Sequence, residues 1–243
     1  MARPTTHSTG AWARFLDTIR SSSVYFDVLE CSPTGLSRLR LTPSSFRWQA
    51  LARRNGRRRG EVAVVDGDQG PEPRAVLHLA DGTPVALRPI QPDDAERLRR
   101  LFYRLSPETV YWRFFSPIQV PREAVLERFA RVDHRRREAI VAVVADEVVG
   151  VARYDQDVGT DEADTAILVE DAWQGRGLAK VLLRRLAEVA GERGIRTFTA
   201  LILGENVRAR HLYSSVFAGV DATLVGSEWH LRIPLEGSGA GCP

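Results

Sequence analysis

The sequence contains few cysteines and no long hydrophobic run. Cys31 and Cys242 lie near opposite ends of the 243 residues without metal-ligand spacing, so neither a disulfide framework nor a metal site is indicated. No apolar run approaches the roughly 20 residues of a membrane span, and no apolar signal-peptide core follows the first residues. We therefore expect a cytoplasmic protein with no membrane partner and no bound metal.

Lysine is almost absent, because Lys180 is the only lysine among the 34 basic residues. This bias is more typical of a GC-rich genome than of a physical demand. The densest basic run spans residues 53–60 (RRNGRRRG), and such a run can form an arm that binds nucleic acid. No aromatic stacking residues or known nucleic-acid module accompany it, so a solvated basic linker is the simpler interpretation.

Residues 65–73 (VDGDQGPEP) are rich in turn formers and indicate a domain boundary. We predict a basic, flexible N-terminal extension over residues 1–75, one globular domain over 76–236 and a disordered tail over 237–243. The composition of the whole chain, 44% hydrophobic and 27% charged, is ordinary for a globular protein.

The domain is predicted to alternate strands and helices. Strand-like runs surround the turn dipeptide at residues 81–82, and three amphipathic helices follow, the second capped by Ser106. Later elements are strands at 138–145, 148–154, 165–169, 197–203, 222–225 and 229–233, with helices beginning near 178 and at Asn206. The order is β, three helices, β, β, β, α, β, α, β, β, which predicts an α+β domain with a mixed sheet.

Residues 163–179 (ADTAILVEDAWQGRGLA) combine a buried strand, a glycine turn and the start of an amphipathic helix. Glycines let the backbone approach a ligand, and the first N–H groups of a helix bind phosphates. The segment 174–179 lacks the Lys-Ser/Thr ending of a P-loop and the spacing of a dinucleotide fingerprint. It resembles the Gln/Arg-x-x-Gly-x-Gly/Ala pyrophosphate motif of the GNAT acyltransferase superfamily, through Gln174, Gly177 and Ala179.

Other stretches carry the same resemblance. Residues 85–95 (VALRPIQPDDA) and 105–115 (LSPETVYWRFF) are similar to the opening of the bacterial Pat-type protein lysine acetyltransferases. Asn206, followed by Ala209, Leu212 and Tyr213, resembles the last helix motif of the superfamily. The resemblance implies a GNAT fold over roughly residues 80–235, with a mixed, mostly antiparallel central sheet flanked by helices.

The resemblance also implies acetyl-CoA as co-substrate. The residues it assigns to acetyl-CoA are Ile167, Leu168, Val169, Gln174, Gly175, Arg176, Gly177, Leu178, Ala179, Lys180 and Asn206. Backbone N–H groups near Leu168 and Val169, where the central strand splays, would stabilise the oxyanion of the reaction.

Pat-type enzymes commonly carry a glutamate base on the central strand, and the aligned residue here is Asp164. Glu162 lies on the same strand face one repeat earlier and is the reserve candidate. Another position used for the base in this superfamily is occupied by Leu201. Tyr213 is expected to be the general acid. Neither cysteine lies in a matched motif, so we expect direct attack by the acceptor rather than an acyl-enzyme.

The expected activity is transfer of an acetyl group to a primary amine, with a protein lysine as the expected acceptor. One alternative is a small-molecule amine such as an aminoglycoside or polyamine. Another is a non-catalytic acyl-CoA sensor whose N-terminal arm contacts nucleic acid. The sequence leaves the acceptor, the acyl-chain preference and the oligomeric state open.

Overall fold

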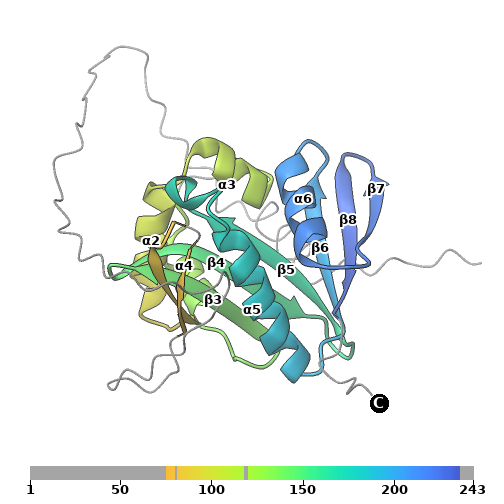
Figure 1. Ribbon diagram of the computed structural model, residues 1–243, viewed down its shortest axis with the longest axis horizontal. Helices are drawn as coiled ribbons and strands as arrows, with labels where there is room; N and C mark the ends of the chain where they lie inside the picture. The colour runs from red at the N-terminus through yellow and green to blue at the C-terminus, as the bar shows by residue number, and fades with distance from the viewer. Residues whose placement is uncertain (1–74, 80, 118–119, 236–243) are drawn as a thin grey trace, which may run out of the picture.

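A computed structural model describes residues 75–79, 81–117 and 120–235 (Figure 1). The strands are β1 (Ala75–His78), β2 (Pro84–Pro89), β3 (Arg137–Val144), β4 (Glu147–Gln156), β5 (Glu162–Val169), β6 (Thr197–Leu203), β7 (Asp221–Val225) and β8 (Glu228–Pro234). The helices are α2 (Asp94–Tyr103), α3 (Pro107–Phe114), α4 (Glu123–Ala130), α5 (Leu178–Glu192) and α6 (Val207–Val216), with a 3-10 turn η2 (Asp171–Trp173). Within these ranges, no helix is long and apolar enough to cross a bilayer.

The strands form a single sheet in the order β1-β2-β3-β4-β5-β6-β8-β7. All neighbours are antiparallel except β5 and β6, which are parallel. The mixed, mostly antiparallel sheet predicted from the sequence is therefore confirmed. The opening hairpin contributes two strands to the sheet, where the predicted order counted one.

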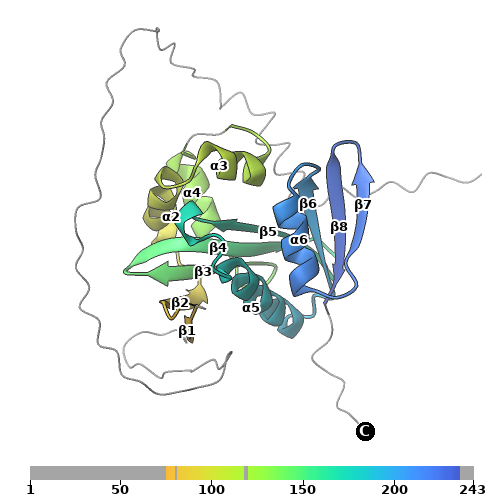
Figure 2. The same ribbon diagram turned by 45° about the horizontal axis from the view of Figure 1, so that its top comes forward.

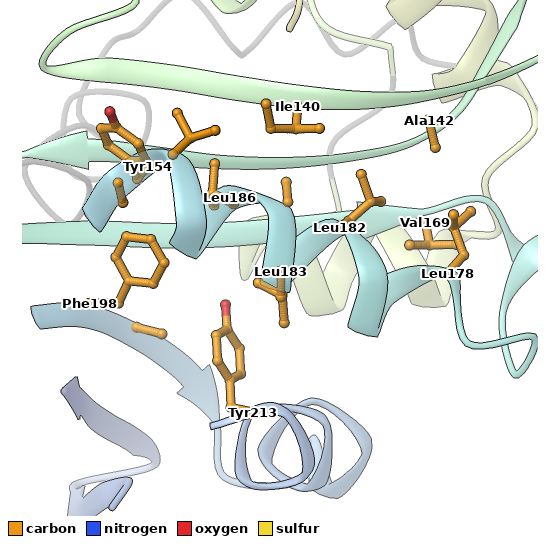
Figure 3. Close-up of a cluster of buried hydrophobic side chains, with 14 of the residues drawn as sticks. Ile140, Ala142, Tyr154, Val169, Leu178, Leu182, Leu183, Leu186, Phe198 and Tyr213 are labelled. Atoms are coloured by element: carbon orange, nitrogen blue, oxygen red, sulfur yellow. The ribbon is translucent and has the colours of Figure 1, made fainter. Parts of the chain in front are cut away.

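Helices cover both faces of the sheet (Figures 1 and 2). On β3, Ile140 and Ala142 are buried with the apolar face of α5, while Ala139 and Val141 are buried with α2 and α4. Because side chains alternate across a strand, each face of β3 belongs to a different core, and the strand is apolar on both faces. Figure 3 shows Leu182 and Leu186 of α5 packed against β3 and β4.

The predicted helix starts at Ser106 and Asn206 are confirmed. Ser106 Oγ accepts a hydrogen bond from Thr109 N at 3.1 Å, and Asn206 Oδ1 accepts one from Ala209 N at 2.9 Å. Helix α2 has an additional anchor, since Asp94 accepts two hydrogen bonds from Arg88 at 2.6 and 2.7 Å in a buried pair. Removing one partner of a buried ion pair costs about 3–5 kcal/mol, so this pair fixes α2 to the end of β2.

The predicted N-terminal extension, apart from Ala75, and the predicted tail at 237–243 lie outside the described residues. The described part begins with β1 and ends shortly after β8. The domain limits at 76 and 236 stay predictions.

Candidate active site

The sheet opens where β5 and β6 separate. The two strands pair only over residues 162–164 of β5 and 197–199 of β6. Beyond this segment β5 remains paired with β4 as far as Val169, and β6 remains paired with β8 as far as Leu203, so the strands diverge (Figure 2). A cleft of about 770 Å³ lies at this divergence, lined by β5, the start of α5, and residues of α3 and α6.

Two backbone amides of β5 face the cleft. Glu170 donates its N–H to the Val149 carbonyl oxygen of β4 at 3.0 Å. Because alternate residues of a strand direct their N–H groups to the same neighbour, the N–H of Leu168 also faces β4. The N–H groups of Ile167 and Val169 face the opposite side. Leu168 lines the cleft, but its N–H, expected from the sequence to stabilise the oxyanion together with that of Val169, faces β4. The N–H groups of this strand that face the cleft are those of Ile167 and Val169.

The glycine turn places the beginning of α5 at the cleft. Gly177 is the N-cap with φ 86°, a left-handed conformation that glycine adopts without strain. Its carbonyl oxygen accepts from Lys180 N at 3.1 Å and from Val181 N at 3.4 Å. The N–H groups of Leu178 and Ala179 precede these first intrahelical bonds, and both residues line the cleft. The helix start therefore presents the donors that an anionic group needs.

Gln174 braces the loop through its side chain. Its Nε2 donates to the Val169 carbonyl oxygen at 3.0 Å and to Thr109 Oγ1 at 3.1 Å. The side-chain amide therefore joins the loop to β5 and to α3. Because the side-chain amide is used in these two hydrogen bonds, Gln174 would contact acetyl-CoA through its backbone.

Arg176 is held by the turn between β1 and β2. Its Nε donates to Asp81 Oδ2 at 2.9 Å, and its NH2 donates to Asp81 and, at 2.8 Å, to Thr83 Oγ1. The guanidinium also lies 4.4 Å from the centroid of the Trp173 ring. The hydrogen bond from Thr83 N, together with the one from Arg176, lowers the pKa of the Asp81 carboxyl to about 2. The charge of Arg176, expected to face a phosphate, is thus already shared with Asp81.

Asp164 lies at the point where β5 and β6 begin to diverge, since it is the last residue of β5 that pairs with β6. Its side chain is 5% exposed and accepts a hydrogen bond from Thr199 Oγ1 at 3.0 Å. Glu162 lies one strand repeat deeper in the closed part, 29% exposed, in an ion pair with Arg232 at 2.6 Å. Neither residue lines the cleft directly, but Asp164 is the nearer to its opening along the strand.

Tyr213 projects from α6 toward α5, beside Leu183 (Figure 3), and lines the cleft. Its side chain is 3% exposed, and burial raises the pKa of the phenol above its ordinary value, with Arg113 and a hydrogen bond to Thr165 opposing that shift. The phenol is therefore protonated at neutral pH. Asn206, which caps the same helix, also lines the cleft.

Asp164 and Tyr213 belong to opposite faces of the sheet. Asp164 shares its strand face with Leu168, which packs in the core beneath α2 and α4. Tyr213 packs in the core beneath α5. The opening between β5 and β6 is where groups from the two faces can approach one molecule.

Helix α3 contributes cleft residues that the sequence indicates only through the family resemblance of residues 105–115. Trp112 and Arg113 both line the cleft. Burial, with repulsion from Arg153, lowers the pKa of the Arg113 guanidinium. Among the described residues, no cluster of three or more His, Cys, Asp or Glu side chains is arranged to hold a metal ion.

The comparisons with known proteins decide the family. The model of the acetyltransferase (GNAT) family matches residues 98–217. The chain is 33% identical over 162 residues to acetyltransferase PA5475 of Pseudomonas aeruginosa, covering 65% of this chain and 84% of that protein. The chain belongs to the GNAT acetyltransferase family. It is therefore an acetyltransferase that uses acetyl-CoA as its co-substrate.

Two further relatives concern Pat proteins. The chain is 31% identical over 131 residues to acetyltransferase Pat of Mycolicibacterium smegmatis, covering 52% of this chain and 38% of that protein. The crystal structure of the GNAT domain of S. lividans PAT has a TM-score of 0.63 and 34% identity, covering 67% of this chain and 97% of that domain. The predicted GNAT fold and the predicted similarity to Pat-type proteins are confirmed.

Proposed function

We propose that this acetyltransferase transfers the acetyl group directly to the side-chain amine of a protein lysine. The observation that carries the proposal is the divergence of β5 and β6. It brings strand amides, a glycine-led helix start and a protonated tyrosine to one cleft. These groups fit acetyl-CoA, since an extended chain can bond the strand amides while anionic phosphates meet the helix start.

We assign the binding of acetyl-CoA to both sides of this cleft. The N–H groups of Ile167 and Val169 would hold the acyl arm, and those of Leu178 and Ala179 the phosphates. The Lys180 ammonium, on an exposed residue that lines the cleft, adds positive charge nearby. When bound, acetyl-CoA supplies an acetyl thioester as the electrophile.

Asp164 and Tyr213 are assigned to the two proton transfers. A lysine arrives as an ammonium ion at neutral pH, and Asp164, through a water, removes the proton that blocks its attack. The neutral amine then adds to the acyl carbon, so that the C–N bond forms and the C–S bond breaks. The nitrogen gives up its second proton, which restores the phenol of Tyr213 after that residue has protonated the sulfur, and the proton on Asp164 passes to solvent. Tyr213 donates its phenolic proton to the departing sulfur from the other face of the sheet.

A second hollow next to the cleft favours a polypeptide acceptor over a small amine. It measures about 420 Å³ and is lined by α3, α6 and the β7–β8 hairpin, including Tyr111 and Trp229. Tyr111 precedes Trp112 of the main cleft, and their rings lie 5.6 Å apart. A small amine needs only the cleft, whereas residues that flank a lysine need such an adjoining surface.

The proposal is tested by thiol release from acetyl-CoA with a panel of amines at equal concentration. The panel contains lysine peptides, a polyamine and an aminoglycoside, each with wild type and Tyr213→Phe. We expect turnover with lysine peptides that depends on Tyr213. Turnover restricted to a small amine would support the small-molecule alternative, and acetyl-CoA binding without turnover on any member of the panel would support the sensor.

A further inference from the structure

Asp171 ties the acetyl-CoA loop to helix α3, although it takes no part in the chemistry proposed above. It lies in η2, directly after β5 and before the glycine turn. Its Oδ2 accepts from Ser106 N at 2.8 Å, and its Oδ1 accepts from Ser106 Oγ at 2.7 Å and from Thr109 Oγ1 at 2.8 Å. One carboxylate thus bonds three donors that are more than 60 residues away in the chain.

The donors are the groups that begin α3. Ser106 is its N-cap, and Ser106 Oγ accepts from Thr109 N while donating to Asp171. A carboxylate beside a helix N-terminus also meets the positive end of the helix dipole. Partial burial opposes ionisation of Asp171, but the hydrogen bonds from Ser106 and Thr109 outweigh it and lower the pKa of this carboxyl.

A second link runs parallel to the first. Thr109 Oγ1 accepts from Gln174 Nε2, and the same Nε2 donates to the Val169 carbonyl oxygen. The segment from Val169 to Gln174 is therefore joined to the first turn of α3 at two places. Three residues beyond Thr109 on α3, Trp112 lines the cleft.

We propose that Asp171 is a positioning residue that fixes the acetyl-CoA loop against α3, so that the helix start at Gly177 is set before acetyl-CoA binds. The proposal rests on the proposed site of acetyl-CoA and not on the identity of the acceptor. A loop fixed in advance loses less entropy when the ligand binds. Loss of the Asp171 hydrogen bonds to α3 should therefore weaken acetyl-CoA binding without lowering the rate of acetyl transfer once the substrates are bound.

The test is Asp171→Asn, which keeps the shape but leaves one acceptor oxygen for three donors. We expect the Kd for acetyl-CoA, measured by calorimetry, to rise about 10-fold or more, the order of one hydrogen bond to a charged group. With an active acceptor, we expect the KM for acetyl-CoA to rise similarly and kcat at saturation to stay within about twofold.

Asp133→Asn is the matched control. Asp133 Oδ1 accepts from the N–H groups of Arg135, Arg136 and Arg137 at 2.8–2.9 Å, just before β3 and outside the cleft lining. It is the same substitution at a carboxylate that also satisfies several donors. We expect it to lower the melting temperature while leaving the Kd for acetyl-CoA unchanged.

Ser106→Ala and the double variant with Asp171→Asn test whether Asp171 acts through Ser106. If Asp171 acts through Ser106, the double variant binds acetyl-CoA no more weakly than the worse single variant. An unchanged Kd in a folded Asp171→Asn protein would overturn the proposal, and so would a lower kcat with an unchanged KM. An error in the proposed function would be seen separately, because wild type would then show no turnover with lysine acceptors. The Kd values of wild type and Asp171→Asn for acetyl-CoA could still be compared by calorimetry.

Discussion

Gly177→Glu is the most informative perturbation of the acetyl-CoA loop, because the structure separates its effect on folding from its effect on binding. Gly177 has φ 86°, and a Cβ built there meets no atom within 4 Å. The folded state is therefore penalised only through the backbone, by about 1–2 kcal/mol for a left-handed residue. For a domain of this size, 1 kcal/mol lowers the melting temperature by roughly 2–4 °C.

The effect on binding is larger. The new carboxylate would stand at the N-terminus of α5, where we place the phosphates. Two like unit charges about 4 Å apart repel by ~1 kcal/mol in water and by ~4 kcal/mol at an effective dielectric constant near 20. Since every 1.4 kcal/mol is tenfold in affinity, the Kd for acetyl-CoA should rise between about 5-fold and about 1,000-fold.

Gly194→Glu provides the matched control at the other end of α5. Gly194 has φ 82° and equally open surroundings, so its backbone penalty is the same. Both variants are compared with wild type by thermal unfolding and by calorimetric titration with acetyl-CoA. We expect a loss in melting temperature from both variants, larger for Gly194→Glu because its carboxylate meets the negative end of the helix dipole, but a weaker Kd only for Gly177→Glu. Equal Kd values for the two variants would refute the assignment of phosphates to this helix start.

Four further predictions concern the proton transfers, the buried phenol and the domain limits. Asp164→Asn should lower kcat by roughly 10²- to 10⁴-fold with little change in the Kd for acetyl-CoA, Asp164→Glu should be tolerated, and Glu162→Gln should do little. An unchanged kcat in Asp164→Asn together with an inactive Glu162→Gln would instead identify Glu162 as the general base. Because burial raises the pKa of Tyr213, we expect its phenol to stay protonated below about pH 10, the usual tyrosine value; kcat measured from pH 7 to 10 should then show no alkaline loss attributable to it. The raised pKa of Tyr213 also affects unfolding, because the stability that the neutral buried phenol contributes is complete below about pH 10 and is lost above it. We therefore expect the melting temperature of wild type to fall more steeply above pH 10 than that of Tyr213→Phe. Equal declines in the two proteins would contradict a contribution from this phenol. A chain lacking residues 1–74 should fold and turn over like the full chain, as measured by thermal unfolding and thiol release, whereas an insoluble or inactive core would make the N-terminal segment part of the domain.

The sequence predicts the fold well because the elements are strongly periodic. The apolar face of α5 recurs every three or four residues, and Ser106 and Asn206 are side chains that commonly cap helices. The central strand begins at Glu162, three residues before the apolar run that predicts it. Pairing with β4 continues to Gln156, so polar residues are carried into the strand by hydrogen bonds that no hydrophobic pattern shows.

The contacts that hold the loop could not be predicted in the same way. Asp81 appears in the sequence only as the first residue of an Asp-Gly turn, yet it holds Arg176 from 95 positions away. Asp171 likewise appears as an acidic residue between strand and turn, yet it bonds Ser106. These partners are polar side chains at the sheet edge and in loops, and their meeting depends on tertiary geometry rather than on any local period. The motif residue Gln174 illustrates the same limit, because its side chain serves as a brace between β5 and α3.

The central claim is that the acetyl group passes from acetyl-CoA to protein lysines. The most direct measurement incubates the protein with radiolabelled acetyl-CoA and a cell lysate, with Gly177→Glu as the control, and then separates protein-bound from small-molecule label. We predict protein-bound label that is stable to acid, reduced with Gly177→Glu and recovered as Nε-acetyl-lysine on complete digestion. Label found only in small amines, or protein label that does not depend on Gly177, would contradict the claim.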